Sequence, residues 1–331
     1  MKVLWTHNYS PTCQSSGVFM FLLADAMKEV GVDVHLHYTG SLRNAWRLRR
    51  TTEEIAELSR KFDIAHAQFG SACSLVTSRA VCPKIVSLRG TDLLGSDTGG
   101  LVARLHGRVV CHMTRRALPA YERVIVMSDR MRAELALHHR RNHEVEVIPD
   151  GIDLHQFQPM DRREARHRLG LTEDTRPWVL FASLHSNNPL KRPQLAREAV
   201  AAAAGKRPEI VLKTLTGQSH DQVALWMNAA NVLLLTSTRE GWPNVVKEAI
   251  ACNTPFVATD VSDLVEIARV EASCTVAEAT PSALAKGILH AIDSPRPTDL
   301  HQQMQSMNMG AIALKIRSLY EQVSSRTPIA A

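Results

Sequence analysis

A segment that directly follows the apolar run Val232–Leu235 combines residue types suited to binding an anion. The apolar run predicts a buried strand, and a turn must follow it. Gly241 permits a tight turn, and Pro243 suits the first turn of a helix. The backbone N–H groups of Asn244 and Val245 would then be free at a helix N-terminus, where the helix dipole also favours an anion.

Two carboxylates flank this turn. Glu240 is expected in the loop and Glu248 one to two turns into the helix. One carboxylate can then face the centre of a crevice, while the other faces whatever extends along the helix. A diphosphate linked to two sugars would match, with its phosphates at the amides and one carboxylate on each sugar. A solvated acidic turn followed by a surface glutamate is the plainer interpretation of the same two residues.

The stretch from Glu240 to Glu248 resembles the signature of the retaining GT-B glycosyltransferases of family 4, also called glycosyl transferases group 1. The strand before it and the run Phe256–Ala258 after it agree with that signature. Four further motifs extend the resemblance over most of the chain. Gly17 after Ser15-Ser16 resembles the family's glycine loop, and Asp63–Gln68 resembles its D-x-x-H-x-H strand. Arg89–Asp92 resembles its H-G-T-D turn, and Ile148–Asp153 resembles its I-P-N-G-I-D linker.

The resemblance implies a donor site. Glu248 would accept hydrogen bonds from the ribose of a nucleotide, and Glu240 would hold hydroxyls of the transferred sugar. The amides of Asn244 and Val245 would take the diphosphate, next to Gly241 and Pro243. The Gly17 loop would close over the diphosphate from the other domain.

The resemblance also implies a cation for the leaving diphosphate. Lys191 follows a predicted strand and resembles that lysine, and a preorganised cation contributes several kcal/mol at such a position. The arginine that the family usually has just before the lysine is replaced here by the stretch 183–187. Arg192 is therefore the candidate for the second cation. An exposed lysine at a helix start is the alternative interpretation of Lys191.

The acceptor side is less well defined by the motifs. His66, Arg89 and Asp92 are the candidates for acceptor contact, although a lone histidine on a strand also fits a purely structural role. Arg89 replaces the family's first histidine of H-G-T-D, and Gln68 replaces the second histidine of D-x-x-H-x-H. The resemblance implies front-side attack with retention of anomeric configuration and no metal.

Eleven short apolar runs must position these residues, and helical patterns lie between or after them. Their lack of alternation is typical of strands buried on both faces of a parallel sheet. The α/β pattern predicts two Rossmann-like, doubly wound domains facing a central cleft, as in GT-B proteins. The runs are Lys2–Trp5, Val32–Tyr38, Asp63–Ala67, Ile85–Leu88, Val124–Met127, Val145–Ile148, Trp178–Ala182, Ile210–Leu212, Val232–Leu235, Phe256–Ala258 and Cys274–Val276.

The pattern of runs stops and restarts once, which predicts the domain boundary. Residues 1–155 are expected to form an acceptor domain and residues 156–300 a donor domain, with a linker within 150–175. Residues 301–325 are expected to form a helix that closes back toward the N-terminal domain. The length of 331 residues suits two domains.

Composition sets further bounds. With 45% hydrophobic and 22% charged residues the chain is an ordinary globular one. The six cysteines are scattered without zinc-type spacing, as expected of packing residues in a reducing cytoplasm. The polar residues after Trp5 leave no room for a signal sequence. The apolar run Val18–Ala24 is far below the ~20 residues that span a bilayer, so we expect a cytoplasmic protein with at most peripheral membrane contact.

The net charge of +6 gathers in two arginine clusters in the first half. One places a tryptophan among arginines on one helix face, at Arg43, Trp46, Arg47 and Arg50. The other follows the Arg89–Asp92 turn, at Arg104, Arg108, Arg115 and Arg116. Each cluster fits an anionic membrane surface, a phosphorylated acceptor or a solvated face.

Taken together, these features predict a retaining, metal-independent transferase of the hexosyl type. It would move a sugar from a nucleotide-diphosphate sugar, UDP before GDP, to a hydroxyl of a carbohydrate or lipid-linked acceptor in polysaccharide or glycoconjugate biosynthesis. A nucleotide-sugar epimerase of the same fold is one alternative. A basic nucleic-acid-binding protein is another, but aromatic residues make up just 5% of the chain and no binding motif occurs. No cofactor and no nucleic-acid partner are expected.

Overall fold

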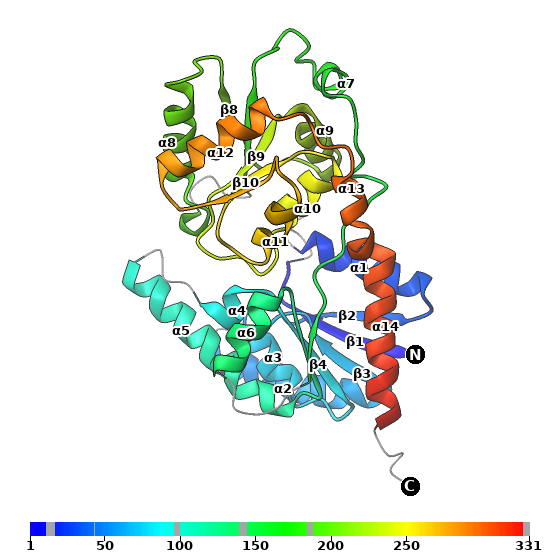
Figure 1. The fold of residues 1–331 in the computed structure, drawn as a ribbon. Helices are drawn as coiled ribbons and strands as arrows, with labels where there is room; N and C mark the ends of the chain where they lie inside the picture. Colours follow the sequence, from blue (N-terminus) through cyan, green and yellow to red (C-terminus); the bar gives the residue numbers. More distant parts are fainter. Residues whose placement is uncertain (11–16, 43, 96–99, 139–143, 184–187, 327–331) are drawn as a thin grey trace. The chain divides into compact units, whose positions relative to one another are not determined.

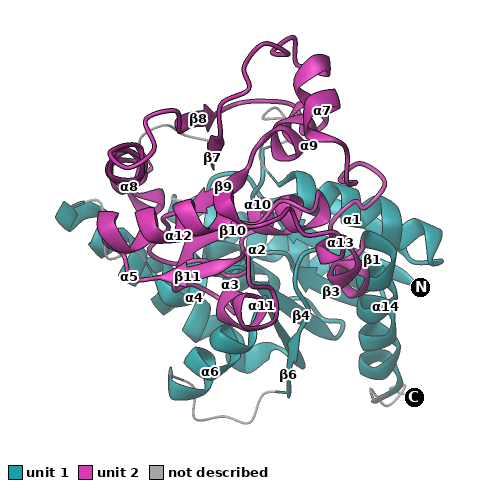
Figure 2. Ribbon diagram, turned by 45° about the horizontal axis from the view of Figure 1, so that its top comes forward, with its two compact units in different colours: residues 1–151, 309–331 teal, residues 152–308 magenta. Residues whose placement is uncertain are grey.

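The computed structural model describes residues 1–10, 17–42, 44–95, 100–138, 144–183 and 188–326 (Figure 1). The chain divides into two compact units (Figure 2). Unit 1 comprises Met1–Gly151 and Met309–Ala331, and unit 2 comprises Ile152–Asn308. The division falls at Gly151 rather than at 155, and the last segment of the chain joins unit 1.

Unit 1 is built on a parallel sheet of six strands in the order β2-β1-β3-β4-β5-β6. Each strand coincides with one of the apolar runs, which confirms the expected α/β class. The central strands are buried along all or nearly all of their length because helices cover both faces. The strands are β1 (Lys2–His7), β2 (Asp33–Tyr38), β3 (Ile64–Ala67), β4 (Lys84–Leu88), β5 (Arg123–Val126) and β6 (Glu144–Val147).

The helices of unit 1 form two layers. The first layer pairs α1 with α14, the last helix of the chain. In the second layer α3 lies between α2 and α5 and packs against both. The helices are α1 (Val18–Glu29), α2 (Ala45–Leu58), α3 (Ser71–Thr77), α4 (Thr91–Leu94), α5 (Gly100–Ala117), α6 (Asp129–His138) and α14 (Met309–Arg326), with short 3-10 turns η1 (Ser59–Lys61) and η2 (Leu118–Ala120).

Unit 2 repeats the same principle with five parallel strands in the order β11-β10-β9-β7-β8. Helices α8 and α12 pack together on one face over an apolar cluster, and α7, α9 and α10 form the other layer. The elements are α7 (Arg162–Arg168), β7 (Trp178–Ala182), η3 (Pro189–Lys191), α8 (Pro193–Ala204), β8 (Val211–Leu215), α9 (His220–Ala229), β9 (Val232–Leu235), α10 (Asn244–Ala251), β10 (Phe256–Thr259), α11 (Leu264–Val270), β11 (Thr275–Ala277), α12 (Pro281–Asp293), α13 (Leu300–Gln303) and η4 (Gln305–Met307).

Each sheet contains one point where the strand order reverses. In unit 1, β1 lies between β2 and β3, and in unit 2, β7 lies between β8 and β9. The connections on either side of such a point leave in opposite directions and open a crevice at the carboxyl ends of the strands, where doubly wound proteins bind ligands. The loops after β1, β3, β7 and β9 are therefore the first places to search for a site.

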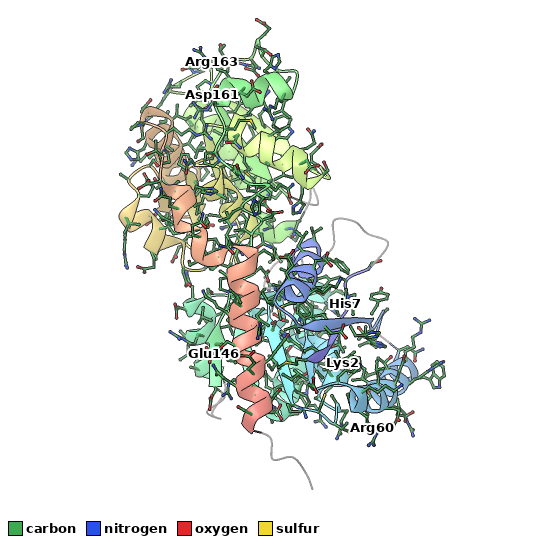
Figure 3. The ribbon with its side chains drawn as sticks, turned by 90° about the vertical axis from the view of Figure 1, so that its right-hand side faces the viewer. Lys2, His7, Arg60, Glu146, Asp161 and Arg163 are labelled. Atoms are coloured by element: carbon green, nitrogen blue, oxygen red, sulfur yellow. The ribbon has the colours of Figure 1, made fainter. Side chains whose placement is uncertain are left out.

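The segment expected to be a linker is part of the core of unit 2. Asp161 caps α7 through its side chain, which accepts hydrogen bonds from the amides of Arg163 and Glu164 (Figure 3). On the same helix, the guanidinium of Arg166 donates to main-chain carbonyls of Ala229, Asp174 and Arg176. It also stacks over the Trp178 ring, 4.1 Å from the centroid. Such side chain to backbone contacts leave no periodic signal, so the segment resembled a charged linker.

A buried network attaches α14 to the sheet of unit 1. The Tyr320 hydroxyl accepts a hydrogen bond from Trp5 Nε1 at 2.8 Å and lies 2.6 Å from His66 Nδ1. All three side chains are almost fully buried. The last helix is therefore held by specific polar contacts to β1 and β3 as well as by apolar packing. Within the described ranges, no helix is long and apolar enough to cross a membrane.

We expect Tyr320→Phe to destabilise the protein by about 2 kcal/mol, because it leaves the buried Trp5 and His66 nitrogens without their shared partner. Urea unfolding followed by circular dichroism measures this change as a lower midpoint. Tyr38→Phe is the matched control, because the Tyr38 side chain is exposed. Equal midpoints for the Tyr320 variant and the wild type would show that the network contributes nothing.

Candidate functional site

A reciprocal clamp joins the turn after β7 to the loop after β9. Arg192 Nε donates to the Thr236 carbonyl at 2.6 Å, and Arg192 Nη2 donates to the Ser237 carbonyl at 2.9 Å. In return, Thr236 Oγ1 donates to the Lys191 carbonyl at 2.6 Å. The Thr238 amide adds a bond to the carbonyl of Leu190 at 2.9 Å. These bonds fix two loops that flank the strand-order reversal of unit 2.

The clamp brings two of the predicted site residues together. Lys191 Nζ lies 2.5 Å from Glu240 Oε1. The side chains keep 25% and 17% of their surface exposed, so a ligand can reach both. A cation and a carboxylate at the carboxyl ends of β7 and β9 can bind an anionic group and a sugar hydroxyl side by side.

The N-terminus of α10 supplies main-chain donors at the same edge of the sheet. Pro243 is the N-cap residue, and the amides of Asn244 and Val245 in the first turn have no acceptor within the helix. Asn244 Oδ1 and, across the loop, Ser237 Oγ are buried without a hydrogen-bond partner. Gly241 between them is held by Ser262, whose hydroxyl donates to the Gly241 carbonyl at 2.7 Å. Orphaned polar groups beside free amides indicate a polar ligand.

Glu248 lies in the second turn of α10 and is partly buried. Burial raises the pKa of its carboxyl to about 7, while the nearby cations Lys247 and Lys191 oppose this rise. Lys247 itself is almost fully buried, with Nζ 5.5 Å from the centroid of the Trp242 ring. A carboxylate in so poorly solvated a position is a strong acceptor for ligand hydroxyl groups.

Arg192 makes contacts that its predicted role as a second phosphate cation did not include. Its Nε and Nη2 donate to the carbonyls of the β9 loop. The residue also adopts a left-handed conformation, with φ of 48°. Arg192 therefore braces the site, and its contact with a phosphate stays a prediction. Of the stretch 183–187 that departs from the family pattern, positions 184–187 lie outside the described residues.

In unit 1, Gly17 is the N-cap residue of α1 and has a φ of 75°. A Cβ atom at this position would lie 2.5 Å from Cγ of Tyr9. Both the backbone conformation and the close approach of the Tyr9 ring therefore require glycine here. Ser15 and Ser16 of the same motif, and Cys13, lie outside the described residues, so the role of the glycine loop in binding a diphosphate stays a prediction.

His66 is fully engaged within unit 1. Its Nδ1 bonds to the Tyr320 hydroxyl and its Nε2 lies 2.9 Å from Ser87 Oγ, so both ring nitrogens have partners. Burial lowers the pKa of His66 to about 3, and the positive charge of Arg89 adds to this effect. His66 is therefore a neutral structural histidine. These contacts do not support the prediction that it binds an acceptor.

Asp92 is also structural. Its carboxylate accepts hydrogen bonds from the amides of Gly70, Arg89 and Gly90 at 2.8 to 3.1 Å. The side chain is fully buried. It holds the loops after β3 and β4 together, and the expected acceptor contact is not supported. The aspartate of the turn motif thus shapes the turn.

Arg89 sits in a cluster of its own. Its Nη2 donates to Gln68 Oε1 at 2.8 Å, its Nε donates to the Gln68 carbonyl at 3.0 Å, and its Nη1 pairs with Asp150. The guanidinium also lies over the Phe19 ring, 4.5 Å from the centroid. The pair is mostly buried, with 8% and 10% of the two side chains exposed.

The strand-order reversal of unit 1 is flanked by two buried nitrogen atoms without a partner. His7 Nδ1 lies at the end of β1, and Gln68 Nε2 lies just after β3 (His7 is labelled in Figure 3). The ring of Tyr9 contacts both His7 and the Phe69 ring in the same loops. The sequence names both positions, His7 as a candidate for acceptor contact and Gln68 as the replacement of a motif histidine, but it does not show that these two nitrogens lack partners.

Other residues of unit 2 were also missed. Ser237 and Lys247 lie inside the stretch between the β9 strand and Glu248, but serine in a loop and lysine on a helix are ordinary surface residues. The one available signal was their position, since both fall within the motif that carries the two glutamates. Among the described residues, no group of three or more His, Cys, Asp or Glu side chains could hold a metal ion.

The first arginine cluster lies at the start of α2. Trp46 is 64% exposed, and the Arg50 guanidinium lies 5.4 Å from the centroid of its ring. Arg43 lies outside the described residues. The helix begins at Ala45 and runs to Leu58, well beyond the short helix predicted over this cluster.

The fold and the place of the site define a protein with two Rossmann-like units of GT-B architecture. Residues 4–156 match the model of Glycosyltransferase Family 4, and residues 187–294 match the model of Glycosyl transferases group 1. The chain belongs to these family 4, or group 1, glycosyltransferases.

Two curated relatives illustrate the range of the family. TuaC of Bacillus subtilis, named as a teichuronic acid biosynthesis glycosyltransferase, is 27% identical over 253 residues, which are 68% of this chain and 60% of TuaC. D-inositol 3-phosphate glycosyltransferase of Mycobacterium tuberculosis is 31% identical over 170 residues, which are 43% of this chain and 35% of that protein. The matched part thus spans less than two thirds of either relative.

Solved structures share the fold along almost the whole chain. Sucrose-phosphate synthase from Thermosynechococcus elongatus has a TM-score of 0.76 at 18% identity and covers 99% of this chain and 100% of its own. HepE from Anabaena, in complex with UDP and glucose, has a TM-score of 0.66 at 16% identity and covers 98% of each chain. At these identities the likeness shows the fold alone.

The raised pKa of Glu248 predicts a pH-dependent gain in stability for Glu248→Gln. The folded protein favours the protonated carboxyl, so wild-type stability is full below the ordinary glutamate pKa and falls as the pH rises through about 7. Glutamine carries no charge at any pH. We expect the variant to exceed the wild type by about 2 kcal/mol at pH 8.5 and to match it at pH 4.

Thermal unfolding of the ligand-free protein at the two pH values measures this difference. Glu278→Gln, at an exposed position in unit 2, is the matched control and should leave stability unchanged at both. An advantage of Glu248→Gln that persists unchanged at pH 4 would contradict the burial argument.

Proposed function

We propose that the protein is a retaining glycosyltransferase that transfers a hexose from a nucleotide-diphosphate sugar to a hydroxyl group. The observation that carries this proposal is the Lys191–Glu240 pair at the strand-order reversal of unit 2. Free amides of α10 and the poorly solvated Glu248 lie on the same motif. Together they offer a cation and amides for a diphosphate, and two carboxylates for the hydroxyls on either side of it.

In this proposal the carboxylates bind hydroxyl groups, and the main-chain amides and the lysine bind the diphosphate. Glu248 accepts hydrogen bonds from the ribose, which orients the nucleotide, and the amides of Asn244 and Val245 bind the diphosphate. Glu240 holds hydroxyls of the transferred sugar. As the bond to the sugar breaks, negative charge grows on the leaving diphosphate, and Lys191 stabilises that charge.

We propose that the reaction retains the anomeric configuration and proceeds without a covalent nucleophile. The acceptor oxygen attacks from the face that the diphosphate leaves, and a donor phosphate oxygen takes the acceptor proton. The anomeric configuration is thereby kept without a covalent nucleophile, and the catalytic cation is Lys191 rather than a metal ion. Coupling constants of the anomeric proton in the product report this part of the proposal.

UDP is the proposed nucleotide, and a glycan or lipid-linked sugar is the proposed acceptor. HepE, which shares the fold, was solved with UDP and with UDP-glucose, and this supports UDP before GDP. TuaC is named for a cell-wall polymer, and this supports a role in polysaccharide or glycoconjugate biosynthesis. In unit 1 we assign acceptor contact to His7, Gln68 and Arg89, because the first two have buried nitrogens without partners.

The donor is tested by calorimetry with UDP, GDP and ADP and their common hexose conjugates. We expect binding of UDP and UDP-hexoses, and at least a tenfold weaker affinity for Glu248→Ala, because the ribose loses its charged acceptor. Glu278→Ala serves as the matched exposed control. Binding of GDP compounds alone would overturn the choice of base, and binding of no nucleotide would overturn the proposed function.

Turnover tests the role of Lys191. We expect Lys191→Ala to lower kcat about 100-fold or more, with less than a tenfold change in donor affinity, because the cation acts mainly on charge that develops in the transition state. An assay that monitors UDP release during donor hydrolysis or transfer measures kcat and the apparent affinity for the donor. Lys206→Ala, an exposed lysine just after the opposite end of α8, is the control. A loss of donor affinity with kcat unchanged would assign Lys191 to ground-state binding instead.

A further inference from the structure

Helix α5 carries an unusual concentration of exposed apolar side chains. Leu101 and Val102 are 84% and 83% exposed, Leu105 is 61% exposed and Val109 is 45% exposed. The other large exposed apolar residues of the described chain lie singly on separate elements. Single exposed apolar residues are normal, whereas a contiguous group marks a binding surface. We call these four residues, with the arginines beside them, the α5 outer face.

The opposite side of α5 already has its packing partners. Its buried residues are small or polar and recur at helical spacing, at Gly107, Cys111, Thr114 and Ala117. Thr114 Oγ1 accepts the amide of Ser71 at 2.7 Å, and Cys111 Sγ lies 3.3 Å from the carbonyl of Leu93. The helix is therefore fixed against α3 and α4 by this inner side. The larger apolar side chains point away from it.

The shape of unit 1 agrees with this division. Figure 1 and Figure 2 both show the first turns of α5 extending past the neighbouring helices of unit 1. Leu101, Leu105 and Val109 lie four residues apart and so form one stripe along the helix.

The positive charge of α5 indicates which kind of partner binds the α5 outer face. Its sequence from Gly100 to Ala117 contains four arginines and no aspartate or glutamate. Arg104 and Arg108 are one turn apart and lie beside the apolar stripe, and Arg115 and Arg116 follow in the last turn. An apolar stripe bordered by arginines is the pattern of a helix that lies in the surface of a bilayer with anionic lipids.

The first arginine cluster, on α2, fits such a surface less well. Arg49 pairs with Glu53 at 3.0 Å, and the same helix carries Glu54 and Glu57. Its exposed apolar surface is limited to Trp46. We therefore favour α5 over residues 43–50 for the membrane contact. Helix α5 lies in the same helix layer as α2, and α3 separates the two.

We propose that the α5 outer face binds the surface of a bilayer that contains anionic lipids. Leu101, Leu105 and Val109 enter the region below the headgroups, and the arginines contact lipid phosphates. A second copy of this chain is a poorer occupant, because pairing two such faces would bring eight arginines together without an acidic partner on either helix. This surface is independent of the donor site, so it goes beyond the proposed function.

Vesicle sedimentation of the full chain tests the proposal. The probes are vesicles of phosphatidylcholine alone and of phosphatidylcholine with about one third phosphatidylglycerol. We expect the wild type to bind the anionic vesicles at least tenfold more tightly. Leu101→Ser/Leu105→Ser should lose at least tenfold in affinity at both low and high salt. Arg108→Gln/Arg115→Gln should lose at least fivefold at low salt and less at high salt, where charges are screened.

Leu137→Ser on α6 is the matched control, because Leu137 is 78% exposed in the same unit. It should bind vesicles like the wild type, and all variants should bind UDP compounds as the wild type does. Loss of nucleotide binding would concern the proposed function and leave the vesicle result interpretable.

Three results would overturn the proposal. The first is a failure of the wild type to sediment with anionic vesicles, and the second is sedimentation of both α5 variants like the wild type. The third result is a dimer in sedimentation velocity that Leu101→Ser/Leu105→Ser converts to a monomer, which would make a second copy the occupant.

Discussion

The clamp between Arg192 and the carboxyl end of β9 is the interaction on which the candidate site of unit 2 depends. Two carbonyls of the β9 loop accept from one guanidinium, and Thr236 returns a bond to the turn that carries Lys191. Parallel strands bring their carboxyl ends to one edge of a sheet, but they do not fix the loops that follow. The clamp joins the turn at Lys191 to the β9 loop, and Arg192 has a left-handed backbone, which is unusual for a residue with a side chain. The clamp therefore holds Lys191 near Glu240.

Charge balance in the site follows from this constraint. In the absence of a diphosphate, Lys191 is neutralised by Glu240, and the cost of burying charge falls on Glu248, whose pKa rises to about 7. In the proposed function, a diphosphate would bring negative charge to Lys191 and the α10 amides. Glu240 would then be available to sugar hydroxyls. The Lys191–Glu240 pair thus offers a cation and a carboxylate at one place, as the proposed nucleotide-sugar donor requires.

The fold and the donor motif could be predicted from the sequence, while several site assignments could not. The central strands are short, largely apolar runs, because strands inside a parallel sheet are buried on both faces. Glu240, Glu248 and Lys191 were recognisable from their place after strands. The contacts of Arg192, His66 and Asp92 could not be predicted, because their partners are backbone groups or residues far away in sequence, as with His66 and Tyr320. The segment before β7 resembled a linker for the same reason, since Arg166 binds three carbonyls. Periodicity records burial, and it does not record such hydrogen bonds.

Three departures from the family motifs meet in one place in unit 1. Gln68 and Arg89 each stand where the resembling motifs have histidine, and Asp150 stands where the linker motif has asparagine. In the structure Arg89 binds Gln68 through two hydrogen bonds and pairs with Asp150. A buried guanidinium without a carboxylate would be costly, and so would a buried carboxylate without a cation. The three residues therefore form one mutually dependent unit, in which an ion pair and two hydrogen bonds join the replaced motif positions. The side-chain oxygen of Gln68 accepts a hydrogen bond from Arg89, whereas its side-chain nitrogen has no partner. The cluster therefore leaves a hydrogen-bond donor at the strand-order reversal of unit 1. An acceptor that binds there must offer an oxygen to that donor, as a sugar hydroxyl does.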